Sequence, residues 1–231
     1  MIDKTTTVSK ALENVTCGMS VMVGGFGVPG TPFLLINGLL GSGADRLILI
    51  KNEANEAGLG VSLLLEAGRV SRLITSHLGL NSLAIAMMNK KEIEVNFYPQ
   101  GILAEKIRAG GAGLLAIVTD IGINTILRRE ENVVQLDGRE GMIEPALRAN
   151  IALIHAAKAD RAGNLVYEKS ARNFNPLMAT AADLVIAEAE EIVETGEIPP
   201  DQVHTPGAFV DHVVPIGELL PEYGVLKHHV R

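Results

Sequence analysis

The 231-residue sequence contains one cysteine, Cys17, and no tryptophan, and aromatic residues make up only 3% of it. A single cysteine cannot form a disulfide within the chain or a multi-cysteine metal site. Because aromatics are scarce, the core must be built from Leu, Ile, Val and Ala, as is common in a parallel sheet covered by helices. The histidines lack H-x-x-x-H and H-E-x-x-H spacing, so no metal site is expected.

The sequence also lacks an excess of basic residues and any long apolar run. Its formal net charge of −7 argues against nucleic acid as a partner. No apolar run approaches membrane-spanning length, and the N-terminal MIDKTTTVSK has no apolar region of the kind found in a signal peptide. We therefore expect a reduced, cytoplasmic protein with no membrane partner.

Short apolar runs typical of strands alternate with helical segments along the chain. Strands are expected at residues 20–25, 46–50, 69–76, 91–99, 114–118, 133–136 and 182–189, and as a pair around a turn at 160–163. Helices are expected at residues 31–40, 61–68, 81–89, 101–111 and 173–182. No linker or repeat divides the chain. The pattern predicts an α/β fold with an open, mainly parallel sheet flanked by helices, in a single domain of residues 1–231.

Some segments carry more specific signals. Thr31 followed by Pro32 is typical of a helix start, with Thr31 as the N-cap. The run 114–118 is expected as a buried strand, and the alternation in 91–99 indicates a strand at the margin of the sheet. The proline-bearing tail beyond Ile198 is expected to wrap the surface or another subunit.

The stretch VMVGGFGVPGTP contains a G-x-G-x-x-G pattern between a strand and a helix, formed by Gly25, Gly27 and Gly30. Glu53, near the end of the next strand, lies roughly where a dinucleotide-binding domain places its ribose-binding acid. However, Pro29 and Pro32 remove two amide donors from this stretch, and the helix-start signal falls after the third glycine. From the pattern alone, dinucleotide binding, another ligand and a simple tight turn all remain open.

Four collinear motifs carry a resemblance to a known family. They are VMVGGFGVPGTP, PQGILAEKIRAGGAG, KADRAGNL and SARNFNPL, and HTPGAFVDHVV in the tail adds to them. In this order they resemble the A (alpha) subunit of family I CoA-transferases of the acetate or 3-oxoacid (acetoacetate) type. The resemblance extends from about Met19 to His212. It implies an open α/β sheet, and an enzyme of ketone body and fatty acid metabolism.

The resemblance implies a two-subunit enzyme that moves CoA from an acyl-CoA, such as acetyl-CoA, to a short-chain carboxylate or 3-oxoacid. The CoA thioester would be a substrate, with no permanently bound cofactor, and the assembly a hetero-oligomer (α2β2 or larger). In this family a glutamate within a Glu-Asn-Gly motif of the B subunit forms the glutamyl-CoA thioester. The chain has no such motif, because Glu13-Asn14 and Glu131-Asn132 are each followed by valine. The enzyme is therefore expected to be active only with a B subunit.

The resemblance also implies which residues line the site. A glycine loop would let the backbone approach a bound acyl or pantetheine group, and comprises Gly24, Gly25, Phe26, Gly27, Val28, Pro29 and Gly30. Asn52 and Glu53 match a polar pair, Asn-Asn or Asn-Asp in relatives, that lines the acyl-carboxylate site. Gln100 matches a family glutamine whose amide can donate to the substrate carboxylate or the thioester oxygen.

Each of these assignments has a structural alternative: a turn without ligand contact for the loop, a solvated acid for Glu53 and a turn residue for Gln100. KADRAGNL is expected to form a hairpin turn, and Arg172, Asn173 and Asn175 to order the sheet edge or the subunit seam. Two other functions remain as alternatives, an NAD-dependent oxidoreductase that uses the G-x-G-x-x-G loop and a non-catalytic scaffold of the same superfamily.

Overall fold

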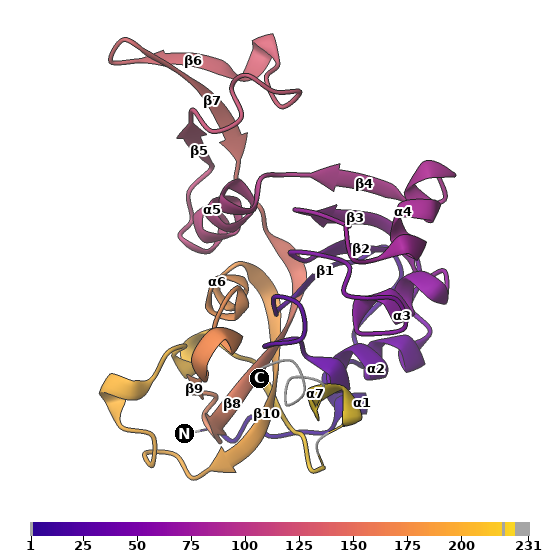
Figure 1. Ribbon diagram of the computed structural model, residues 1–231. Helices are drawn as coiled ribbons and strands as arrows, with labels where there is room; N and C mark the ends of the chain where they lie inside the picture. Colours follow the sequence, from indigo (N-terminus) through magenta and orange to yellow (C-terminus); the bar gives the residue numbers. More distant parts are fainter. Residues whose placement is uncertain (1, 219, 225–231) are drawn as a thin grey trace.

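The computed structural model describes residues 2–218 and 220–224 (Figure 1). The strands are β1 (Ser20–Val23), β2 (Leu47–Ile50), β3 (Val70–Thr75), β4 (Glu94–Phe97), β5 (Ala116–Thr119), β6 (Val133–Leu136), β7 (Arg139–Pro145), β8 (Ala149–Asp160), β9 (Leu165–Val166), β10 (Ala182–Val193) and β11 (His212–Pro215). The helices are α1 (Val8–Ala11), α2 (Phe33–Ser42), α3 (Val61–Glu66), α4 (Ser82–Asn89), α5 (Gln100–Gly111), α6 (Asn175–Thr180) and α7 (Pro221–Gly224). None of the described helices has both the length and the apolar character needed to cross a membrane.

The main sheet has the strand order β11-β10-β8-β1-β2-β3-β4, and β9 pairs with β8. All neighbours along this path are parallel, and only β9 runs antiparallel. The predicted open, mainly parallel sheet is therefore confirmed, with β4 at its margin as expected. The tail behaves differently from the prediction, because Ile186 pairs with His212 and residues 212–215 form the opposite edge strand.

Both faces of this sheet are buried. Val21 and Val23 of β1 belong to an apolar cluster with α1 to α4, whereas Met22 lies in a second cluster with α5 and α6. Successive side chains of a strand point to opposite faces, so a strand covered on both sides is apolar throughout. With both faces covered, ligands can approach the central strands only at their ends.

The order in which strands are added to the sheet reverses at β1. Strands β2, β3 and β4 follow on one side of β1, and β8, β10 and β11 lie on the other. Helix α2, which follows β1, packs with the first cluster, and α6, which follows β8 and β9, packs with the second. Ligands of open α/β sheets bind at the carboxyl ends of strands where such a switch occurs. The glycine loop, residues 24–30, lies at this switch point.

A smaller antiparallel sheet, in the order β5-β7-β6, projects away from the main sheet (Figure 1). A strand, β5, does form near the predicted 114–118, but the prediction that it is buried is wrong, because Leu115 is 92% exposed and Val118 is 51% exposed. Strand β7 was not expected from the sequence. Asp137 and Gly138 connect β6 to β7, and both have positive φ, +49° and +75°, as a tight hairpin turn requires.

Candidate active site

The glycines of the loop are required mainly by contacts within the chain. Gly25, Gly27 and Gly30 have φ of +97°, +62° and +73°. A Cβ at Gly24 would overlap the side chain of Asn175, and one at Gly30 would overlap the carbonyl oxygen of Ala171. At Gly27, by contrast, the nearest atom is 3.9 Å away, on Pro29. Only Gly27 therefore faces open space where a ligand could approach the backbone.

Side chains from distant segments hold the loop. The carbonyl oxygen of Gly27 accepts hydrogen bonds from Thr31 Oγ1 (2.7 Å) and Asn55 Nδ2 (2.8 Å). Thr31 is thus not the N-cap that the sequence predicts. Helix α2 begins two residues later, after Pro32, which offers no side-chain cap. The Thr31 hydroxyl is used to close the loop instead.

The SARNFNPL motif braces the same loop from the other face of the sheet. Asn173 Nδ2 donates to the carbonyl oxygen of Pro29 (2.9 Å), and Asn175 Nδ2 donates to that of Gly30 (3.1 Å). Asn175 is fully buried, and its Oδ1 accepts from the amide of His155. These asparagines therefore order the glycine loop, a role that sequence analysis did not assign to them.

Asn52 and Glu53 lie just beyond the carboxyl end of β2, separated from it by Lys51, and both are buried. The Glu53 carboxylate is 3.0 Å from Lys51 Nζ, and the side chains of Lys51 and Glu53 are 0% and 4% exposed. Glu53 Oε2 also accepts from Asn52 Nδ2 (2.8 Å), and Oε1 lies 3.4 Å from Asn55 Nδ2. Glu53 is thus not a solvated loop acid, because both carboxylate oxygens are engaged inside the protein.

Asn52 connects Glu53 to Gln100. Its Oδ1 accepts from Ser76 Oγ (2.9 Å), which follows β3, and from Gln100 Nε2 (2.8 Å), at the first position of α5. The three segments come from neighbouring parallel strands, whose carboxyl ends lie at one edge of the sheet. The structure therefore brings together Asn52, Glu53 and Gln100, as the sequence predicts.

A hollow of about 260 Å³ lies beside Gln100 and the glycine loop. We call it the site hollow, and it is lined by Phe26, Gln100, Gly101, Ala104, Asn173, Phe174 and Leu177. Within residues 2–218 and 220–224, the amides of Gly27 and Val28 and the first amides of α5 have no hydrogen-bond acceptor. The hollow thus joins an apolar wall to the first amides of α5, and the amides of Gly27 and Val28 follow directly after Phe26 of that wall. Such N–H donors favour an oxyanion or carboxylate.

The N-terminus of α2 is not available to a ligand. The amide of Phe33 donates to Thr31 O (3.0 Å), that of Leu34 to the Tyr223 hydroxyl (3.3 Å) and that of Leu35 to Glu188 Oε2 (2.9 Å). A dinucleotide-binding loop presents these first-turn amides to pyrophosphate. Here a protein carboxylate already takes that position, so the geometry disfavours the NAD-dependent alternative.

His155 lies against the same carboxylate. Its Nδ1 is 2.9 Å from Glu188 Oε1, and its Nε2 is 3.0 Å from Glu190 Oε1. Burial lowers the pKa of His155, but the hydrogen bonds and charges of the two carboxylates outweigh burial and raise the pKa to about 9. The imidazole is therefore a cation at neutral pH that donates through both nitrogens. The positive charge of His155 balances the negative charge of Glu188, which is buried at the N-terminus of α2.

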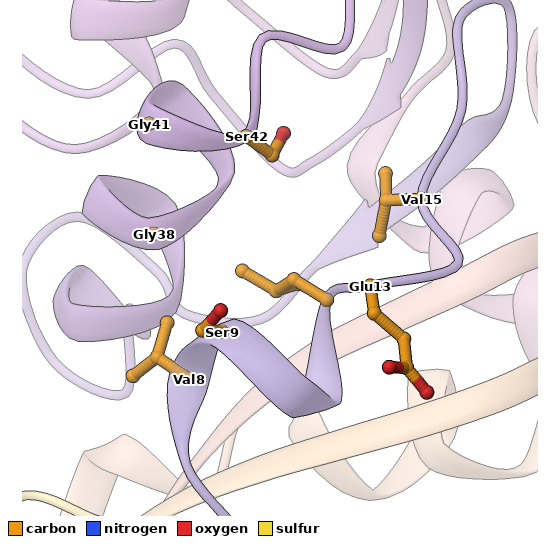
Figure 2. A pocket seen from close by; sticks show the side chains of 8 residues that line it. Val8, Ser9, Glu13, Val15, Gly38, Gly41 and Ser42 are labelled. Carbon is orange, nitrogen blue, oxygen red and sulfur yellow. The ribbon is translucent and has the colours of Figure 1, made fainter.

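A second hollow, of about 480 Å³, lies between α1 and α2 (Figure 2). Its lining includes Gly38, Gly41 and Ser42, at the end of α2 that is remote from the glycine loop. The carboxylate of Glu13 points away from α2 (Figure 2) and pairs with Lys10 at 2.7 Å. This hollow offers no set of convergent polar groups, so the chemistry of the chain lies at the carboxyl edge of the sheet.

Several residues of the site were missed from the sequence, namely Lys51, Asn55, Ser76, His155 and Glu188, whereas Asn173 and Asn175 were singled out but not as supports of the glycine loop. A signal existed for Lys51 and Ser76, because Lys51 directly follows one predicted strand and Ser76 is the last residue of another, so both belong at the carboxyl edge. No local signal pointed to the contact of Glu188 with α2 or that of Asn175 with the loop, because both contacts join segments more than a hundred residues apart.

Comparisons with known proteins agree with this architecture. Residues 5–215 match the sequence model of the family described as Coenzyme A transferase. The chain is 46% identical to the alpha subunit of the acetate CoA-transferase of Escherichia coli K12, over 85% of this chain and 90% of that protein. It is 41% identical to the A subunit of the 3-oxoadipate CoA-transferase of Acinetobacter baylyi, over 94% and 96% of the two chains.

Among solved structures, the fold is similar to that of an acyl-CoA transferase of Escherichia coli O157:H7, determined as a thioester complex with CoA. The TM-score is 0.83 and the sequence identity is 22%. The match covers 95% of this chain but 48% of the other, so the chain spans about half the length of that protein. At this identity the likeness shows the shared fold.

Proposed function

The chain belongs to the coenzyme A transferase family. On this premise, we propose that it is the A (alpha) subunit of a two-subunit enzyme. This enzyme would move CoA from an acyl-CoA to a short-chain carboxylate or 3-oxoacid. Its relatives are named as the alpha or A chains of an acetate CoA-transferase and a 3-oxoadipate CoA-transferase, and these names support both the reaction class and the need for a partner. In this proposal the chain is a single domain of residues 1–231 and belongs to a hetero-oligomer of α2β2 or larger composition. The enzyme would be cytoplasmic and would act in ketone body and fatty acid metabolism.

The observation that carries the proposal is a site where the part of the chain that the structure describes supplies walls and hydrogen-bond donors but no free nucleophile. Glu53 is the acid nearest to the hydrogen-bonded chain that ends at Gln100, and it is only 3% exposed. Both of its oxygens accept hydrogen bonds from Lys51, Asn52 and Asn55. A carboxylate that attacks a thioester needs a free oxygen directed at the carbonyl carbon. A glutamate of a B subunit is the group that we propose for this step.

The reaction needs donors for the oxygen of the attacked thioester carbonyl, which becomes negatively charged. Gln100 Nε2 gives one hydrogen to Asn52 and retains a second one for this oxygen or for the substrate carboxylate. The amides of Gly27 and Val28, which have no acceptor among the described residues and directly follow Phe26 of the hollow, would offer further donors. Phe26, which is 47% exposed, would cover the acyl or pantetheine chain and exclude water. CoA enters as a substrate rather than as a bound cofactor.

The test is reconstitution. The purified chain alone is expected to show no transfer of CoA between acetyl-CoA and acetoacetate or another short-chain acid. Addition of a B subunit that contains Glu-Asn-Gly should restore turnover. Robust activity of the chain without any partner would contradict the two-subunit proposal.

A further inference from the structure

Lys51 and Glu53 form a buried ion pair at the carboxyl end of β2, with 3.0 Å between Nζ and Oε1. Neither residue lines the site hollow. A buried ion pair is weak evidence for stability, because the loss of hydration offsets much of the attraction. The other hydrogen bonds of Lys51 and Glu53 indicate a second role of the pair, in the geometry of the site.

Lys51 reaches both ends of the glycine loop. Its Nζ donates to the carbonyl oxygen of Gly24 (3.1 Å) and to Thr31 Oγ1 (3.1 Å). With Glu53 as the third acceptor, all three ammonium hydrogens are engaged. Thr31 in turn donates to the Gly27 carbonyl oxygen, so the lysine fixes the loop directly at its ends and indirectly at its middle.

Glu53 sets the direction of the amide chain that ends at Gln100. An ionised carboxylate only accepts hydrogen bonds, so Asn52 must turn its NH2 group toward Glu53 and its Oδ1 away. That oxygen can then accept only from donors, and Gln100 must present Nε2 to it. The charge of one buried acid thereby determines which amide atoms Gln100 leaves free at the site hollow.

We propose that the Lys51–Glu53 pair is a positioning device, in which the lysine orders the glycine loop and the glutamate orients Asn52 and Gln100 for CoA transfer. The inference rests on the proposed function as far as it concerns catalysis. Neither side chain lines the site hollow, so in this proposal both act through Gln100 and the loop.

The central variants are Lys51→Met, Glu53→Gln and the double variant Lys51→Met/Glu53→Gln, measured in the complex with the B subunit. Burial lowers the pKa of Lys51, whereas the negative charge of Glu53 raises it. In the Glu53→Gln variant Lys51 can therefore lose its proton instead of remaining an unpaired buried cation. We expect each single variant to reduce kcat about 10-fold or more while KM changes less than about 3-fold. The double variant should regain melting temperature but not kcat.

A matched control is available in the same chain. Lys106 and Glu144 form another buried pair, 2.7 Å apart with side chains 4% and 3% exposed, between α5 and β7. Lys106→Met should lower the melting temperature as Lys51→Met does, yet keep kcat within about 2-fold of the parent value. This comparison separates the loss of a buried ion pair from the loss of site geometry.

Hydrogen exchange on the full chain gives a readout that needs no catalysis. Lys51→Met should speed exchange of the amides of residues 24–30 about 10-fold or more, with β8 and β10 unchanged, whereas Lys106→Met should leave the loop unchanged. If the parent complex transfers no CoA but the loop exchange rises as expected, the proposed function fails and the ordering role stands. If the parent complex is active and the double variant regains full kcat, or loop exchange does not respond, the positioning inference is wrong.

Discussion

The amide of Leu35 donates a 2.9 Å hydrogen bond to Glu188, so a buried carboxylate of β10 occupies the N-terminus of α2. The G-x-G-x-x-G pattern is thus followed by a helix whose first amides already have partners within the protein. A helix N-terminus can hold only one anion at its amides. The glycine pattern alone did not reveal this, because Glu188 lies far along the sequence.

The first prediction concerns this carboxylate. NAD titrated into the full chain in a calorimeter should give no binding heat, because Glu188 excludes the pyrophosphate from α2. Acetyl-CoA with the assembled two-subunit complex serves as the positive control. Tight binding of NAD by the chain would contradict the closed helix terminus.

The second prediction is a pH dependence of stability set by His155. Its pKa is raised from 6.5 to about 9 in the folded chain, so its stabilising charge is fully present below about pH 6.5. The contribution is lost as the pH rises through about 9, because the imidazole then becomes neutral beside Glu188 and Glu190. Melting temperature measured from pH 6 to 10 should fall across this window.

The control for this prediction is His155→Gln, which keeps a neutral amide between the same carboxylates. The variant should be less stable than the parent at pH 6.5, and the difference should shrink toward pH 10. An equal loss of melting temperature at every pH would show that the charge of His155 does not contribute.

The third prediction separates two glycines of the loop. Gly30→Val should lower melting temperature and activity together, since a side chain there would overlap the backbone of Ala171. Gly27→Val meets open space, so it should cost about 1 kcal/mol for its positive φ and reduce kcat far more than that loss explains. Thermal denaturation and kcat of both assembled variants test the difference. If Gly27→Val leaves kcat intact, the loop does not contact the substrate.

The fourth prediction concerns Gln100. Gln100→Ala should lower kcat on the order of 100-fold, the usual effect of removing one donor to a developing oxyanion. The stability should change little, because Gln100 is an exposed residue at the start of α5. Gln100→Glu is an informative partner variant, since it preserves size but repels a carboxylate substrate. A loss of activity that merely follows the melting temperature would argue against a direct role.

The fifth prediction concerns the covalent intermediate. After reaction with an acyl-CoA and borohydride trapping, mass spectrometry of both chains should find the modification on a glutamate of the B subunit. Glu53 should remain unmodified, since its oxygens are engaged by Lys51 and Asn52. A modified Glu53 would overturn the assignment of roles.

The sequence by itself determined the type and order of most elements of the main sheet. Apolar runs such as those of β1, β2 and β3 are short, lie between turn signals and alternate with helical periodicity, which together indicate a parallel sheet with two covered faces. The resemblance to CoA-transferases, carried by motifs such as PQGILAEKIRAGGAG, placed Asn52 and Gln100 in one site, and the two side chains are hydrogen-bonded in the structure. Both inferences depend on short local patterns, which the sequence displays directly.

Only the tertiary structure decided what each polar side chain of the site contacts. Lys51 neutralises Glu53, Asn175 reaches Gly30 across 145 positions of sequence, and Glu188 fills the helix end beside Leu35. The same limit explains the misplaced strand at 114–118, whose apolar run does not specify which sheet it joins. Such contacts depend on strand register and on the packing of distant segments, and neither is encoded in the spacing of neighbouring residues.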